Sequence, residues 1–247
     1  MRLSAPAKLT RSLHITGVRR DGYHLIDAEM ITLDLADELS FDEGDGLEIE
    51  GAAGLPAGDD NLVRRALAAV GRRAAVRLVK RIPPGAGLGG GSADAAAVLR
   101  WAGCTDLAVA ASLGADVPFC VVGGRARVSG VGEVVTPLTP VELAVTLLVP
   151  PFGVSTVEVY RAWDRLGGPT GERNDLEAAA LAVAPELAPW RDRLGEATGA
   201  TPVLAGSGSA WFVEGSFPGE DRCVARAVGP AVGRPATSSP GAGSASA

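Results

Sequence analysis

Apolar and polar residues alternate through much of the first fifty positions of the chain. The alternation is clearest in ITLDL (residues 31–35) and LSF (39–41), and it returns in LEIE (47–50) after the turn sequence DEGDG. A period of two places successive side chains on opposite faces of a strand. The N-terminal segment is therefore predicted to form a β-sheet.

Helical spacing begins near residue 58. Between residues 58 and 73 the apolar residues fall on one face of a helix, and Asp59 or Asp60 is the expected cap of its first turn. A strand is predicted over residues 74–82 and a second helix over residues 94–102. The segment between this strand and this helix is dense in glycine and contains no side chain suited to chemistry.

The second half of the chain mixes helices and strands. Helices are predicted over 107–115, 155–167, 174–198 (with a break near Pro185) and 221–229, and strands over 126–138 (a hairpin), 143–149, 201–206 and 209–215. This order predicts an α+β fold with two domains, residues 1–137 and 138–229. Residues 230–247 consist mainly of Pro, Gly, Ala and Ser and are predicted to be a disordered tail.

Composition excludes several classes of function. The 247 residues include 29 acidic and 23 basic side chains, giving a net charge of −6 without a long basic run. Nucleic acid is therefore not an expected partner, because phosphate neutralisation needs the opposite balance. Three scattered cysteines, the absence of a secretory signal and the lack of an 18-residue apolar run predict a cytoplasmic protein without a membrane partner.

The glycine-rich run at residues 83–93 has two ordinary interpretations. The first is a tight turn between a strand and a helix, but five glycines within seven residues are more than such a turn needs. The run also satisfies the dinucleotide-binding pattern G-x-G-x-x-G at Gly85, Gly87 and Gly90. That pattern requires a tight strand–turn–helix unit, however, and here two prolines separate the strand from the glycines.

A phosphate cradle is the interpretation that we favour for this run. Glycines let the main chain approach an anion closely, and the exposed N–H groups at a helix N-terminus carry partial positive charge. Ser92 adds a hydroxyl donor, and Asp94 lies where the helix dipole favours an acid. An anion such as a pyrophosphate would be held mainly by main-chain donors.

Two residues outside this run are candidates for the chemistry. Lys8 follows a proline at the end of the expected first strand, and Asp116 follows a helix-ending glycine in LGADVPF. An aspartate in apolar surroundings, kept ionised by a lysine, is a plausible base for a hydroxyl group. Spacing alone does not pair the two residues, and singly they also fit a solvated lysine and a turn aspartate.

Taken together, the segments of the chain resemble the GHMP family of small-molecule kinases. The matching segments are PAKL, TGVRRDGYHLID, DNLVRRA, IPPGAGLGGGSADAA, LGADVPFCVVGGRARVSGVGE, NDLE and AGSGSAWF, in that order. The resemblance implies an N-terminal domain like ribosomal protein S5 and a C-terminal ferredoxin-like α/β sandwich. DGYH and LGADVPF are its most specific parts, and they are typical of members that act on a cytidine-diphosphate-linked alcohol of the non-mevalonate isoprenoid pathway.

The resemblance also implies roles for individual residues. The ATP-binding residues would be Asn61 and the run Pro83, Pro84, Gly85, Ala86, Gly87, Leu88, Gly89, Gly90, Gly91, Ser92 and Ala93. Asp116 would accept the proton of the acceptor hydroxyl, and Lys8 would orient Asp116 and stabilise negative charge. The expected substrate-binding residues are Tyr23, His24, Tyr160 and Thr10, with the two tyrosines stacking on the cytosine ring and His24 recognising its polar edge. ATP and Mg²⁺ are the implied cofactors, no metal-ligating residue is assigned, and the expected state is a monomer or homodimer.

The chain departs from the family pattern at several positions. Thr10 replaces a usual asparagine, Arg11 replaces an apolar residue, and Ala93 replaces a second serine. The segment between the loop helix and LGADVPF is also short. Two alternatives therefore remain beside the kinase hypothesis: a GHMP kinase for a different small alcohol, and a non-catalytic nucleotide-binding homologue.

Overall fold

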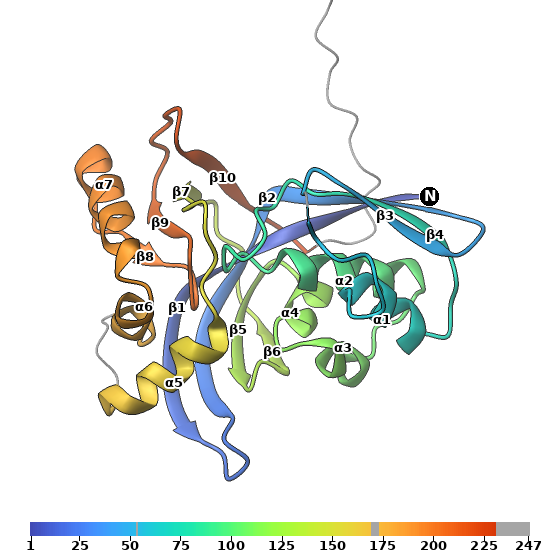
Figure 1. Ribbon diagram of the computed structural model, residues 1–247, viewed down its shortest axis with the longest axis horizontal. Helices are drawn as coiled ribbons and strands as arrows, with labels where there is room; N and C mark the ends of the chain where they lie inside the picture. Colours follow the sequence, from blue (N-terminus) through green and yellow to red (C-terminus); the bar gives the residue numbers. More distant parts are fainter. Residues whose placement is uncertain (53, 169–172, 231–247) are drawn as a thin grey trace, which may run out of the picture.

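The computed structural model describes residues 1–52, 54–168 and 173–230 of the chain (Figure 1). The strands are β1 (Arg2–Val18), β2 (His24–Asp42), β3 (Gly46–Glu50), β4 (Ala75–Val79), β5 (Arg125–Gly130), β6 (Val134–Pro137), β7 (Ala144–Leu148), β8 (Val203–Leu204), β9 (Trp211–Glu214) and β10 (Cys223–Val228). The helices are α1 (Leu62–Ala69), α2 (Gly90–Trp101), α3 (Leu107–Leu113), α4 (Val117–Val122), α5 (Thr156–Leu166), α6 (Glu177–Val183), the short 3-10 helix η1 (Pro185–Leu187) and α7 (Ala188–Thr198). The predicted α+β class is confirmed.

Strands β1 and β2 form one long antiparallel hairpin. The register shifts at three points along β1: between Pro6 and Lys8, between Thr10 and Ser12, and between Ile15 and Gly17. Such bulges bend a strand and redirect its side chains. Lys8 and Thr10 lie between the first two shifts and are two residues apart, so their side chains are on the same face of β1.

Strand β2 is the strand on which most of the sheet is assembled. It pairs antiparallel with β4 near its C-terminal end and with β5 near its N-terminal end, and Thr32 and Leu33 between them pair with β10. β10 also pairs with β7, so one sheet continues in the order β3-β4-β2-β10-β7-β9-β8. The last strand of the chain thus joins strands of the first and second halves.

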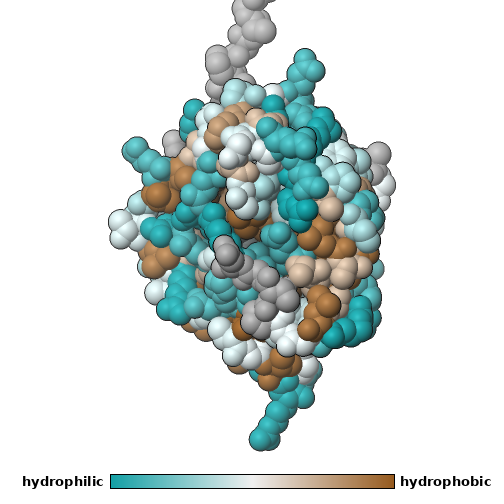
Figure 2. Space-filling model, turned by 90° about the vertical axis from the view of Figure 1, so that its left-hand side faces the viewer, coloured by the Kyte–Doolittle hydropathy of each residue, from teal (hydrophilic) through white to brown (hydrophobic). Residues whose placement is uncertain are grey.

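The helices form two groups on opposite sides of the long hairpin. Helices α1 to α4 lie on one side and α5 to α7 on the other (Figure 1). Residues 93–99 of α2 are all buried, and four of these seven residues are alanines, which lets the helix pack closely against its neighbours. On the face that carries α6 and α7, hydrophilic and hydrophobic residues are interspersed (Figure 2).

The segment predicted as a last helix, residues 221–229, is wrong: it contains strand β10. A local helical pattern is overridden here because the segment fills the gap between β2 and β7, whose backbone groups would otherwise lack partners. The predicted tail, residues 230–247, lies outside the described residues except for Pro230. The predicted domain boundary after residue 137 falls in the connection between β6 and β7 and stays a prediction.

The helix starts also differ from the sequence predictions. Neither Asp59 nor Asp60 caps α1; the side chain of Asn61 does so, accepting a hydrogen bond of 2.9 Å from the N–H of Val63. Helix α2 starts at Gly90 rather than at Asp94, because the loop glycines themselves form its first turn. The residues that follow the predicted helix 107–115, DVPF, open the short helix α4, which was not predicted. None of the helices in the described part of the chain has the length and apolar character needed to cross a bilayer.

Candidate active site

One large cleft, with a volume of about 1240 Å³, contains nearly all of the predicted site residues. Its lining includes Lys8, Thr10, Tyr23, His24, Asn61, the run from Pro83 to Ser92, Asp116 and Tyr160. This volume exceeds that of a typical single-ligand site, so the cleft has room for two small molecules side by side. Ala93 is the exception among the predicted residues, because it is buried in α2 and does not line the cleft.

Lys8 and Asp116, 108 positions apart in the sequence, form an ion pair in this cleft. The Nζ atom of Lys8 lies 3.2 Å from Oδ2 of Asp116 and 3.1 Å from Oγ1 of Thr10. The side chain of Lys8 is 6% exposed and that of Asp116 is 30% exposed. Asp116 is the N-cap residue of α4, yet its carboxylate makes no capping hydrogen bond. The carboxylate is therefore held by the lysine and remains open to the cleft.

The glycine loop packs directly against this ion pair. The N–H of Lys8 donates to the carbonyl of Leu88 at 3.0 Å, which ties the loop to β1. Gly89 adopts a left-handed φ of 68° as the N-cap of α2, and a Cβ there would lie 2.6 Å from Cγ of Lys8. Only glycine satisfies both conditions. The first turn of α2, with its free N–H groups, consequently starts beside the Lys8 side chain.

A second loop, residues 206–209, lies against the glycine loop from the C-terminal half of the chain. A Cβ at Gly87 would lie 2.4 Å from the carbonyl oxygen of Ala205 and 2.7 Å from that of Gly208. Asn174 holds this second loop, donating to the carbonyls of Leu204 at 2.9 Å and Gly206 at 2.7 Å. The loop lies within AGSGSAWF, one of the segments that carry the family resemblance, but sequence reasoning did not identify Asn174 as its support.

A buried charge cluster behind the glycine loop was missed by the sequence analysis. Nζ of Lys80 donates to the carboxylates of Asp37 and Asp94, the latter at 2.7 Å, and all three side chains are at most 5% exposed. Oδ1 of Asp37 also accepts the N–H groups of Arg81 and Ile82 at 2.5 and 2.8 Å. The signal was present in the sequence, because Lys80 occupies the buried phase of the strand pattern that starts at residue 74.

The two carboxylates of this cluster differ in how they are stabilised. Burial raises the pKa of Asp94 to about 7, although the Lys80 ammonium acts in the opposite direction. Oδ1 of Asp94 has no hydrogen-bond partner among the described residues, whereas Asp37 accepts bonds at both oxygens. One ammonium thus serves two carboxylates, and burial disfavours the ionised form of Asp94. Asp94 was expected to be stabilised by the dipole of the helix, but in the structure its charged partner is Lys80.

The predicted base-recognition residues Tyr23, His24 and Tyr160 line the same cleft, and two of them are in contact. Tyr23 is 63% exposed, in the turn before β2. The ring of His24 lies 4.8 Å from that of Tyr160 and 5.4 Å from that of Trp163, measured between centroids. Nε2 of His24 lies 2.7 Å from Oδ1 of Asp164. His24 is therefore surrounded by three residues from one face of α5, of which sequence reasoning identified only Tyr160.

Asn61 and Thr10 line the cleft but already have partners within the protein. Asn61 caps α1 with its oxygen and donates from Nδ2 to the carbonyl of Pro56 at 2.9 Å. Thr10 is 2% exposed and accepts the hydrogen bond from Lys8. The expected contacts of these two residues with ligands stay predictions, and the oxygen of Thr10 is directed to the lysine.

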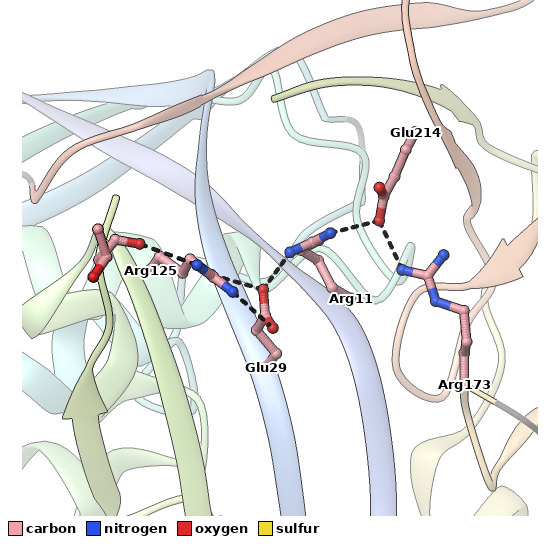
Figure 3. Close-up of polar contacts among 6 residues, drawn as sticks. Arg11, Glu29, Arg125, Arg173 and Glu214 are labelled. Carbon is pink, nitrogen blue, oxygen red and sulfur yellow. Dashed lines mark hydrogen bonds and ion pairs between the residues drawn. The ribbon is translucent and has the colours of Figure 1, made fainter. Parts of the chain in front are cut away.

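Arg11 belongs to a chain of alternating charges that links the two halves of the molecule (Figure 3). Its guanidinium pairs with Glu29 of β2 and, at 2.7 Å, with Glu214 of β9. Glu29 in turn pairs with Arg125 of β5 at 2.9 Å, and Glu214 with Arg173 at 2.7 Å. The departure from an apolar residue at position 11 is thereby matched by two carboxylates.

The described residues offer no ready-made metal site. Within them, His, Cys, Asp and Glu side chains form no group of three that could hold a metal ion. Magnesium usually binds to proteins through one or two carboxylates together with substrate phosphates. The residues of the cleft therefore fit a magnesium ion that is carried mainly by bound phosphates.

Comparison with known proteins defines the class to which this fold and cleft belong. Residues 61–124, which include α1, the glycine loop and Asp116, match the family described as the GHMP kinases N terminal domain. A crystal structure of mevalonate kinase has a similar fold, with a TM-score of 0.56 over 92% of this chain and 99% of that chain, at 12% identity.

Stronger similarities define a narrower group within this class. A 4-diphosphocytidyl-2-C-methyl-D-erythritol kinase of Paracoccus denitrificans is 41% identical over 85% of each chain, and one of Cereibacter sphaeroides is 39% identical over 93% of each chain. A crystal structure of 4-(cytidine 5'-diphospho)-2C-methyl-D-erythritol kinase matches with a TM-score of 0.69 and 35% identity, covering 86% of this chain and 89% of that chain. This chain belongs to the family of 4-diphosphocytidyl-2-C-methyl-D-erythritol kinases, a branch of the GHMP kinases.

Proposed function

We propose that this chain transfers the γ-phosphoryl group of ATP to the 2-hydroxyl of 4-diphosphocytidyl-2-C-methyl-D-erythritol. The observation that carries the proposal is the Lys8–Asp116 ion pair of 3.2 Å, which lies in one cleft with the glycine loop and the aromatic cluster. Phosphoryl transfer needs positioning and charge stabilisation more than covalent catalysis. A main-chain cradle, one carboxylate and one ammonium supply both.

The glycine loop would bind the triphosphate. The N–H groups in the first turn of α2 are not used by the helix and carry the positive end of its dipole. Ser92, half-buried in the same turn, would add a hydroxyl donor. Mg²⁺ would supply charge neutralisation at the phosphates, and Ser92 and Asp116 are the cleft residues that would hold it together with the phosphate oxygens.

Asp116 would accept the proton of the acceptor hydroxyl. Its carboxylate is partly open to the cleft. The neighbouring Lys8 ammonium would stabilise the charge that develops on the transferred group. Thr10 holds the ammonium in place by accepting a hydrogen bond from it. Ala93 replaces a family serine, but it is buried in α2 and does not line the cleft, so the missing hydroxyl is not expected to remove a contact with the phosphates.

The aromatic end of the cleft would bind the cytosine ring. Tyr23 and Tyr160 offer ring faces for stacking, and His24 offers a polar ring edge. This separates the proposal from the alternative of a GHMP kinase for a plain alcohol, which has no use for a base-binding cluster. The three cysteines are free, which supports the predicted cytoplasmic location, and a monomer or homodimer remains the expected state.

The direct test is an assay of ADP release. The protein is incubated with ATP, Mg²⁺ and either 4-diphosphocytidyl-2-C-methyl-D-erythritol, mevalonate or homoserine, and we expect ADP only with the first. ADP with another alcohol would support the different-substrate alternative. Retained ATP binding without ADP release from any alcohol would support the non-catalytic alternative.

The substitution Tyr23→Ala tests the assignment of the base-binding end. We expect the KM for the cytidylyl substrate to rise by about one to two orders of magnitude, since stacking of a base on an aromatic ring contributes about 1–3 kcal/mol. The KM for ATP should be unchanged. A change confined to the KM for ATP would remove Tyr23 from the cytidine site.

A further inference from the structure

Helix α5 presents an acidic residue to the imidazole of His24. Oδ1 of Asp164 lies 2.7 Å from Nε2 of His24, while Tyr160 and Trp163 contact the ring from its other sides. Positions 160, 163 and 164 share one face of a helix because they are three and four residues apart. The ring of His24 is therefore held in one orientation by α5, and its side chain is only 9% exposed.

The carboxylate determines which nitrogen of His24 carries a hydrogen. An ionised carboxylate accepts hydrogen bonds but cannot donate them, so the nitrogen that faces it, Nε2, must be the donor. In a neutral imidazole this leaves Nδ1 as an acceptor. No hydrogen bond joins Nδ1 to another of the described residues, so this acceptor is available to a ligand in the cleft.

We propose that Asp164 sets the base specificity of the cleft by fixing this arrangement of His24. The inference rests on the proposed binding of a cytidine diphosphate moiety beside His24. Cytosine carries an exocyclic amine, a donor, where uracil carries a carbonyl oxygen, an acceptor. An acceptor nitrogen on His24 matches the amine and repels the carbonyl, so Asp164 is a positioning residue that favours cytosine over uracil.

An effect on base preference distinguishes this role from a general effect of the Asp164 charge. Asp164 is half-exposed, with 50% of its side chain accessible, and it would disfavour any pyrimidine diphosphate equally through its charge. Only its effect on the hydrogen of His24 distinguishes the two bases. A change at position 164 that alters discrimination between bases is therefore not expected from a purely structural or long-range electrostatic role.

The substitution Asp164→Asn tests the proposal by binding measurements. Its amide can donate to Nε2 as well as accept from it, so the hydrogen is no longer confined to Nε2 and Nδ1 can become a donor. Cytidine 5′-diphosphate and uridine 5′-diphosphate are titrated calorimetrically into the full chain, with a non-hydrolysable ATP analogue present to occupy the ATP side. We expect the cytidine-over-uridine affinity ratio to fall at least about tenfold in Asp164→Asn, a change of about 1.4 kcal/mol.

Two controls sharpen this test. Asp164→Glu keeps a carboxylate and should retain the preference for cytidine. Glu158→Gln removes the same charge from an exposed position of α5, where Glu158 pairs with Arg161, and should leave the ratio unchanged. An unchanged ratio in Asp164→Asn, or the same loss in Glu158→Gln, would overturn the proposal.

Nitrogen-15 NMR of the imidazoles provides an independent readout. The chain contains two histidines, so His24 can be assigned with the variant His14→Gln. We expect hydrogen on Nε2 in the wild type and a shift toward Nδ1 in Asp164→Asn; hydrogen on Nδ1 in the wild type would overturn the proposal. If the wild type showed the expected hydrogen but no preference for cytidine, the cytidine part of the proposed function would fail together with the specificity role, while the Asp164–His24 pairing would stand.

Discussion

Asp116 is placed at the start of a helix without acting as its cap. The N–H groups at the start of α4 are not bonded by its side chain, and the carboxylate instead contacts the Lys8 ammonium. Pro118, within the first positions of α4, removes one N–H that would compete for the carboxylate. The carboxylate thus stays partly open to the cleft instead of bonding to the helix.

The substitution Asp116→Asn should expose this role. An amide cannot accept the proton of the attacking hydroxyl, so we expect kcat to fall by about 10²- to 10⁴-fold while the KM for ATP stays near the wild-type value. Steady-state kinetics with varied ATP measures both. Turnover like that of the wild type would remove Asp116 from the mechanism.

Asp94 should make the stability of the protein depend on pH in an unusual direction. Its pKa is raised from 3.8 to about 7 by burial, so between these two values the folded state binds more protons than the unfolded state. The stabilisation from this group is complete at low pH and is lost as pH rises toward 7. Lys80 does not titrate in this range, because its pKa is raised above its usual 10.5.

The comparison of wild type with Asp94→Asn isolates this effect. Other carboxylates, such as Glu214, have lowered pKa values and shift the pH dependence in the opposite direction, but they are the same in both proteins. We expect the free energy of unfolding of the wild type, relative to Asp94→Asn, to decrease from pH 5 to about pH 7 and then to level off. A constant difference across this range, measured by urea unfolding, would contradict the raised pKa.

At the scale of elements, the glycine loop and α2 act as one unit with β1. The left-handed backbone at Gly89 starts the helix, and the absence of a Cβ leaves room for the Lys8 stem. The same residue therefore aims the N–H groups of α2 and positions the ammonium. Gly89 was expected to matter for its backbone conformation, and it also determines where the side chain of Lys8 on β1 can lie.

The substitution Gly89→Ala, with Gly71→Ala as its matched control, separates these two effects. Both glycines have similar φ angles, 68° and 62°, but a Cβ at Gly71 meets nothing within 4 Å. Each substitution should cost about 1 kcal/mol of stability from backbone strain. Only Gly89→Ala should also reduce kcat, by displacing Lys8, and equal kcat values for the two variants would contradict this role.

Elements with a strong periodic pattern could be predicted from the sequence, and those fixed by distant partners could not. The helix predicted over residues 155–167 has a clear period of 3.6 and matches α5 within one residue at each end; the N-terminal period of 2 predicted a sheet and located β3, but it did not delimit the long strands β1 and β2. Strand β10 was missed because CVARAV is short and gains its conformation from β2 and β7. The site shows the same division: local motifs pointed to the loop, Lys8 and Asp116. The strand pattern also places Lys80 on a buried face, but it does not indicate the partner Asp37, which lies 43 positions away.

At the scale of the whole molecule, a ladder of charges connects the long hairpin to the C-terminal half. Arg11 lies between Glu29 and Glu214 and is only 17% exposed, so it depends on both partners (Figure 3). Burial alone would raise the pKa of Glu214, but the hydrogen bonds from Arg11 and Arg173 lower it. The ladder is thus a polar contact between parts of the chain that also form the two walls of the cleft.

The substitution Glu214→Gln should weaken this contact. Arg11 and Arg173 would lose a charged acceptor, and we expect the free energy of unfolding to fall by about 1 kcal/mol, a value reduced by the partial exposure of the group. The loss should shrink in about 1 M salt, because screening already weakens the ladder in the wild type. Asp192→Asn, at an exposed pair with Arg191, is the control and should have little effect in urea unfolding; an equal loss in both variants would contradict the role of the ladder.

The central position of β10 has a consequence for biosynthesis. During translation, β1 to β9 are all synthesised before Cys223–Val228, so the facing edges of β2 and β7 have no partner strand between them until β10 follows. A premature stop codon before Cys223 would release a polypeptide with every catalytic candidate present and two open β edges. Such a product is expected to be captured by chaperones or proteases rather than to survive as a smaller kinase.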